Sequence, residues 1–94
     1  VRLPKNLKII EHDAFNSCGL TSVDIPEGTE EIGYRAFIYC DKLTSVTIPR
    51  SVKSIEGMAF AFCSSVPSVT ISRDCEVGFA AFDYEWHGTI NYYD

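Results

Sequence analysis

The side chains best suited to chemistry in this chain are its four cysteines and two histidines. They are Cys18, Cys40, Cys63 and Cys75, with His12 and His87. Structural zinc sites usually draw on closely spaced cysteine pairs, whereas the nearest two cysteines here, Cys63 and Cys75, are separated by eleven residues. The spacing therefore predicts no metal site, and no segment indicates a cofactor.

The sequence also shows no pattern of residues that indicates a catalytic site. Neither histidine can be combined with a serine, cysteine or carboxylate into a recognisable nucleophile–base arrangement. Cysteines that are buried in a core also make poor nucleophiles, because burial raises the thiol pKa. The sequence predicts that the protein is not an enzyme; a generic hydrolase would need a reactive thiol or histidine that nothing in the pattern supplies.

Composition narrows the class of partner. The 94 residues are 46% hydrophobic and 22% charged, which is typical of one small globular domain. Eight basic residues against thirteen acidic ones give a net charge of −5, which argues against nucleic acid and anionic membranes, since both attract basic surfaces. The longest apolar run, residues 58–62, is far shorter than the roughly 20 residues that a membrane span needs, so we expect no membrane insertion.

The cysteines belong to an internal repeat. The pair Ala-Phe recurs in one register at residues 14–15, 36–37, 59–60 and 81–82, at spacings of 22, 23 and 22 residues. The first three pairs are followed three positions later by cysteine, and all four are preceded four positions earlier by an aliphatic residue: Ile10, Ile32, Ile55 and Val77. A fixed period of this length is typical of a solenoid, in which each repeat forms one coil that stacks on the previous one.

Each coil carries an alternating Val-x-Ile run, at residues 23–25, 46–48 and 69–71. Alternation of this kind predicts a short strand with one buried face. Counting a truncated start at residues 1–4 and a last strand at residues 89–92, we expect about five parallel strands in one sheet. The Ala-Phe-x-x-Cys segment on the opposite side is expected to form one turn of 3₁₀ or α-helix, and the aliphatic column before it a second, shorter extended segment.

The repeat resembles the BspA-like, or Treponema-type, leucine-rich repeat family. Residues 20–40 read LTSVDIPEGTEEIGYRAFIYC, which is similar to that family's pattern L-x-x-V-x-I-P-x-x-V-x-x-I-G-x-x-A-F-x-x-C except at Thr29. The resemblance covers residues 1 to about 82. It implies an α/β solenoid: a short right-handed leucine-rich-repeat array of about four 22–23-residue coils, with short 3₁₀/α turns opposite the sheet.

The resemblance also bears on domains and location. We expect a single domain over residues 1–94, regular over 1–82 and with a degenerate coil or cap over 83–94, where Glu85 and His87 replace the cysteine and the leucine of the pattern. Because the chain begins inside a coil, we expect a segment of a longer protein whose neighbouring repeats or domains cover that edge. The family implies an extracellular or cell-surface bacterial protein, and carries over no catalytic or binding residues.

Three surfaces are candidates for binding a partner. The outward face of the sheet presents small polar side chains, and its solvated state is the simpler interpretation: Ser22, Asp24, Ser45, Thr47, Ser68 and Thr70. The column before each cysteine holds Tyr39, Phe62 and Tyr84, with Tyr34 and Trp86 expected nearby. These aromatic residues either pack between coils, which we favour, or form a patch that anchors a partner. The aromatic tail around Trp86 is the third surface, and there a cap or a junction to a following domain is favoured.

The repeated cysteines, Cys18, Cys40 and Cys63, occupy one column of the repeat. Column residues point the same way into the core, which favours free buried thiols, with a disulfide between stacked coils as the alternative.

The leading function is a non-enzymatic protein-binding or adhesion module that recognises a host or bacterial surface or matrix protein. The alternative is a structural spacer array with no ligand of its own.

Overall fold

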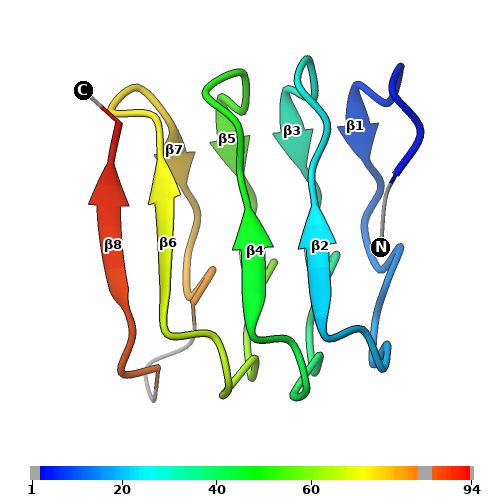
Figure 1. The fold of residues 1–94 in the computed structure, drawn as a ribbon, viewed down its shortest axis with the longest axis vertical. Coiled ribbons are helices and arrows are strands. Elements are labelled where there is room, and N and C mark those ends of the chain that lie inside the picture. Colours follow the sequence, from blue (N-terminus) through cyan, green and yellow to red (C-terminus); the bar gives the residue numbers. More distant parts are fainter. Residues whose placement is uncertain (1–2, 83–85, 94) are drawn as a thin grey trace.

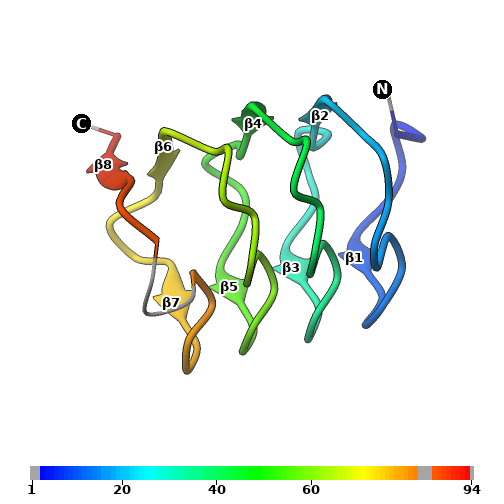
Figure 2. The same cartoon turned by 90° about the horizontal axis from the view of Figure 1, so that it is seen from below.

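The computed structural model describes residues 3–82 and 86–93, and these wind into a solenoid of stacked coils (Figure 1). Each coil contributes a short strand to each of two opposite sides, as the view of the solenoid from below shows (Figure 2). One side holds β1 (Ile9–Ile10), β3 (Glu31–Ile32), β5 (Ser54–Ile55) and β7 (Glu76–Val77). The other holds β2 (Ser22–Asp24), β4 (Ser45–Thr47), β6 (Ser68–Ile71) and β8 (Thr89–Tyr92). The expected solenoid with parallel strands is confirmed.

Residues that share a column of the sequence repeat are paired with each other in the register of neighbouring strands. Val23 on β2 lies opposite Val46 on β4, and Val69 on β6 lies opposite Ile90 on β8. The aliphatic column before each Ala-Phe pair forms a continuous four-stranded parallel sheet in the order β1-β3-β5-β7. Side chains that share a column therefore lie beside each other in neighbouring coils, and alternate residues point into the core.

The sheet on the Val-x-Ile side differs from the expectation, because it is divided. The described residues form two separate pairs, β2-β4 and β6-β8, rather than one sheet of about five strands. Thr44 in the second coil donates its N–H to the Thr21 carbonyl oxygen at 2.9 Å. The residue at the same place in the third coil is Pro67, which has no N–H to donate, so the ladder stops between β4 and β6. Val46 is accordingly partly exposed, whereas Val23 is fully buried.

The start of the chain also departs from the expectation. Residues 3 and 4 form no strand, and residues 1 and 2 lie outside the described part of the chain. The additional strand expected at residues 1–4 is therefore not present in its described half.

The Ala-Phe-x-x-Cys segments form hydrogen-bonded turns and no helix within the described residues. Alternate N–H groups bond inside the coil, as from Ala14 to the Glu11 carbonyl oxygen at 3.2 Å, and the N–H groups between them bond to the next coil, as from Phe15 to the Ala36 carbonyl oxygen at 2.7 Å. A helix would use consecutive N–H groups within its own segment. The expected helical turn is therefore replaced by a ladder of turns, which uses half of its donors to hold neighbouring coils together.

This alternation requires left-handed backbone at fixed places. Two positions recur in the turns with φ between 52° and 62°, and none of them is glycine: Asp13, Arg35, Met58 and Ala80 at one, and Ser17, Tyr39 and Phe62 at the other. Left-handed backbone disfavours residues that carry a Cβ by roughly 1–2 kcal/mol. The contacts between coils must outweigh that cost at every repeat.

A column of aromatic rings runs through the core. Phe15, Phe37, Phe60 and Phe82 stack in consecutive coils, with ring centroids 5.2, 5.1 and 5.4 Å apart. Trp86 continues the stack at 4.7 Å from Phe82. Phe37 and Phe60 are fully buried, as expected for a residue that fills the centre of each coil. The aromatic column therefore links one coil to the next through ring contacts as well as through the backbone.

Candidate partner-binding groove

The cysteines are structural elements of the coils. All four are free thiols, with Cys40 and Cys63 buried and the other two half-buried. The Cys40 thiol donates to the Phe15 carbonyl oxygen at 3.2 Å, and the Cys63 thiol donates to the Phe37 carbonyl oxygen at 3.0 Å. Burial raises the pKa of Cys40 and of Cys75 above the ordinary thiol value. Thiols held in this way favour the protonated form and are weak nucleophiles.

The two histidines lie on the first and the last coil. His12 and His87 are both exposed. Across residues 3–82 and 86–93, no three histidine, cysteine or acidic side chains gather closely enough to hold a metal ion. No helix in that part of the chain is long and apolar enough to cross a membrane.

The outward face of the Val-x-Ile strands lies where the sequence placed it. Its polar side chains are exposed, with Thr70 half-buried: Ser22, Asp24, Ser45, Thr47, Ser68 and Thr70. The division of the sheet changes the shape of this face, because the side chains of β4 and β6 line a shallow depression between the two strands. The six strand residues of this face offer only small polar groups. The larger side chain that lines the depression is Tyr93, whose hydroxyl already donates to the Ile48 carbonyl oxygen at 2.8 Å.

The column before the cysteines presents an exposed aromatic pair. The rings of Tyr39 and Phe62 stack with centroids 4.9 Å apart and planes 8° apart. Tyr39 remains 50% exposed and Phe62 41% exposed, so packing between the coils covers only part of each ring. Ser17 occupies the same place in the first coil with the same left-handed backbone. The fold therefore does not require an aromatic residue at this position.

Two other predicted members of the patch lie elsewhere. Tyr34 is exposed on the coil surface, where its ring lies near Gly57 and its hydroxyl donates to the Met58 sulfur at 3.8 Å. It does not line the surface groove, described below, that contains Tyr39. Tyr84 lies outside the described residues.

Trp86 joins the core and forms one wall of the groove. Its indole Nε1 donates to the Val66 carbonyl oxygen at 2.8 Å, and its ring stacks on Phe82. A Cβ at Gly88 would overlap the indole ring, so the absence of a side chain there makes room for Trp86. The sequence pattern placed His87 at the inward leucine position, but His87 is exposed and Trp86 packs against the core instead.

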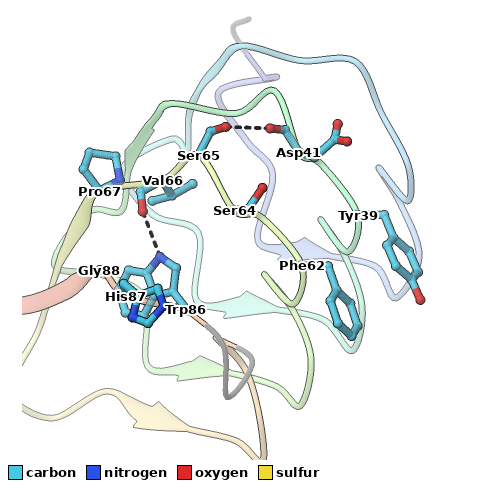
Figure 3. A pocket seen from close by; sticks show the side chains of 10 residues that line it. All are labelled: Tyr39, Asp41, Phe62, Ser64, Ser65, Val66, Pro67, Trp86, His87 and Gly88. Carbon is cyan, nitrogen blue, oxygen red and sulfur yellow. Dashed lines mark hydrogen bonds between the residues drawn. The ribbon is translucent and has the colours of Figure 1, made fainter.

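These residues enclose an open groove of about 720 Å³. Figure 3 shows the Tyr39–Phe62 pair on one side and Trp86 on the other. The described residues that line it are Tyr39, Asp41, Phe62, Ser64, Ser65, Val66, Pro67, Trp86, His87 and Gly88. The structure thus brings together three of the predicted residues, Tyr39, Phe62 and Trp86, which come from three successive coils. We call this feature the aromatic groove.

Several groove residues were missed by sequence reasoning. Asp41, Ser64 and Ser65 follow the cysteine column, and the Ser65 hydroxyl donates to the Asp41 carbonyl oxygen at 2.7 Å. The signal available was the position of these residues, since polar side chains directly after the cysteine must lie next to the aromatic column. Among the described residues that line the groove, Asp41 is the one carboxylate and none is lysine or arginine.

Comparison with known proteins agrees with this geometry. A family model described as "BspA type Leucine rich repeat region" matches residues 1–92. The fold is similar to the crystal structure of a leucine-rich repeat protein from Bacteroides capillosus ATCC 29799, with a TM-score of 0.88 and 24% sequence identity, covering 100% of this chain and 76% of that one. No curated protein matches the sequence. Repeats of the matching family typically serve as non-enzymatic protein-interaction modules. The columns of the repeat, the stacked coils and the family match together show that the chain belongs to the BspA-type leucine-rich repeat family.

Proposed function

We propose that the chain is a protein-binding module of the adhesion type, carried by an extracellular or cell-surface bacterial protein, and that the aromatic groove contacts the partner. The observation that carries the proposal is the stacked pair of Tyr39 and Phe62, which stays about half exposed. Large aromatic residues at the centre of an interface commonly supply most of its binding energy. The family supports a role in protein interaction.

The local backbone strengthens the argument. Tyr39 and Phe62 have φ of 62° and 60°, a conformation that is unusual for a bulky residue. Serine serves at the same place in the first coil, so neither the turn nor the core explains the aromatic choice in the next two coils. A selective advantage outside the fold, such as contact with a partner, accounts for it.

The energy available is sufficient for a hot spot. An aromatic side chain buries roughly 150–250 Å² in full, so covering the exposed half of each ring would remove about 100 Å² from water. At about 25 cal/mol per Å² this gives about 2.5 kcal/mol for each ring. Truncating one ring should therefore reduce the affinity for a partner by roughly 70-fold, and truncating both rings should reduce it further.

The test uses a double substitution and a matched control. Tyr39→Ser/Phe62→Ser gives both positions the residue that the first coil already uses, so the coils should still form. Phe79→Ser is the control, because Phe79 is 75% exposed and lies outside the groove. Binding to purified extracellular matrix and bacterial surface proteins would be measured by biolayer interferometry. Binding that the double variant abolishes and the control retains supports the module.

The spacer alternative predicts a different result. A spacer array binds nothing itself, so the wild type and both variants would give the same undetectable signal. Binding that is equal in the wild type and in Tyr39→Ser/Phe62→Ser would show that the partner uses another face. The polar face around Asp24 and Thr47 would then be the next surface to test.

A further inference from the structure

The charge of the aromatic groove is one-sided. Of the lining residues that the structure describes, Asp41 is the one carboxylate, and none is lysine or arginine. Within residues 3–82 and 86–93, Asp41 forms no ion pair. The groove also presents the hydroxyls of Ser64 and Ser65, while the Trp86 indole N–H is already bonded to the Val66 carbonyl oxygen. The described lining therefore offers aromatic surface and a negatively charged acceptor, with His87 as its one basic side chain.

Arginine already lies against the other tyrosines that the structure describes, Tyr34, Tyr92 and Tyr93. The guanidinium carbon of Arg35 is 5.7 Å from the Tyr34 ring centroid, that of Arg50 is 4.6 Å from the Tyr93 centroid, and that of Arg73 is 5.7 Å from the Tyr92 centroid. These separations are typical of cation–π contacts.

Tyr39 is the exception among the tyrosines in the described part of the chain, because no arginine of that part lies over its ring. It is also half exposed and lines the groove beside Asp41. The chain thus pairs its other described tyrosines with its own cations and leaves this ring available from outside.

We propose that the aromatic groove binds an arginine side chain of a partner protein, which lies against the Tyr39–Phe62 pair and donates hydrogen bonds to the Asp41 carboxylate. This inference rests on the proposed function and specifies the chemistry of its partner. A guanidinium is planar, weakly hydrated and always charged, so it can contact an aromatic ring and a carboxylate together. Lysine fits less well, because its compact ammonium is strongly hydrated. The chain's net charge of −5 favours the approach of a basic segment.

The groove carries its own reporter, since Trp86 is the single tryptophan of the chain. The 94-residue chain would be titrated to millimolar concentrations with the peptide Ac-Gly-Gly-Arg-Gly-Gly-NH₂, and with versions in which citrulline or lysine replaces arginine. Trp86 emission and the amide NMR spectrum would be followed together. Citrulline has nearly the same shape as arginine without its charge, so it isolates the contribution of the ionic contact.

We expect saturable binding of the arginine peptide, at least about tenfold weaker binding of the citrulline peptide, and intermediate binding of the lysine peptide. Tenfold is the lower end of the effect of one charge-assisted hydrogen bond. Asp41→Asn should reduce the affinity for arginine by a similar factor and bring it close to that for citrulline. The matched control is Asp24→Asn, which removes the same charge from the exposed sheet face and should leave binding unchanged. Because Asp41 is exposed, its substitution should leave the urea unfolding midpoint unaltered.

Each outcome is decisive. Equal binding of the arginine and citrulline peptides, no saturable binding of either, or equal effects of Asp41→Asn and Asp24→Asn would each overturn the inference. Such a failure is distinguishable from failure of the proposed function. A protein partner that is sensitive to Tyr39→Ser/Phe62→Ser but insensitive to Asp41→Asn would keep the groove as the binding site and would exclude arginine as its ligand.

Discussion

Replacing alanine by glycine should have opposite effects on stability at a left-handed turn position and at a neighbouring position with ordinary backbone. Ala80 has φ of 52°, where its Cβ costs roughly 1–2 kcal/mol, and glycine would remove that cost. Glycine also adds freedom to the unfolded chain, which destabilises the fold by about 0.4–1 kcal/mol. The balance predicts that Ala80→Gly stabilises the protein by about 0.5–1 kcal/mol. For a domain of this size, that would raise the melting temperature by about 2–8 °C.

Ala14 is the matched control, because it is an exposed alanine in the equivalent ladder of the first coil and is absent from the positive-φ positions. Ala14→Gly has only the unfolded-state effect, so it should destabilise by about 0.4–1 kcal/mol. Both variants would be measured by urea unfolding followed by circular dichroism, with thermal melts as a check. If Ala80→Gly lowers stability as much as Ala14→Gly does, the left-handed backbone carries no strain and the reasoning is wrong.

Three further predictions concern the core, the groove wall and the thiols. Phe60→Ala removes a buried ring from the middle of the aromatic column and should cost about 3–5 kcal/mol in urea unfolding; a loss below 1 kcal/mol would contradict the packing described. Gly88→Ala should displace the Trp86 ring from its position against Phe82, because the new Cβ would overlap the indole, and should shift the Trp86 fluorescence emission to longer wavelength. Unchanged emission would show that Gly88 does not confine the ring. Iodoacetamide should label all four cysteines of the denatured protein without reductant. In the native protein Cys40 should react slowly, with a rate that increases only at pH above the ordinary thiol range, because burial raises its pKa; rapid labelling near neutral pH would refute this.

The repeat made the coil and its register predictable, while local backbone chemistry decided the details. The Val23–Val46 pairing follows directly from the 23-residue spacing. Pro67 lies at the position equivalent to Thr44, where an N–H is needed, and that position belongs to none of the apolar columns that predict the strands. The turns were expected to be helical because a short Ala-Phe-x-x-Cys segment has no periodicity that distinguishes a helical turn from a ladder between coils.

The aromatic groove was predictable in part for a similar reason. Tyr39 and Phe62 share a column, and columns fix which side chains are neighbours. Trp86 could not be placed in this way, because it lies one position away from the leucine column and reaches the core only where Gly88 leaves room. The role of Asp41 depends on the orientation of a turn, which strand alternation does not determine.

The break at Pro67 has a mechanical consequence. On one side of the solenoid, β3, β5 and their neighbours form an uninterrupted ladder, whereas on the other side β4 and β6 are not joined. A load applied along the stack would therefore be carried unequally. The hydrogen-bonded side resists separation of the coils, and the divided side yields first, so the array bends about the β3–β5 side before it ruptures. The third coil thus introduces a point of compliance beside the aromatic groove, which Pro67 itself lines.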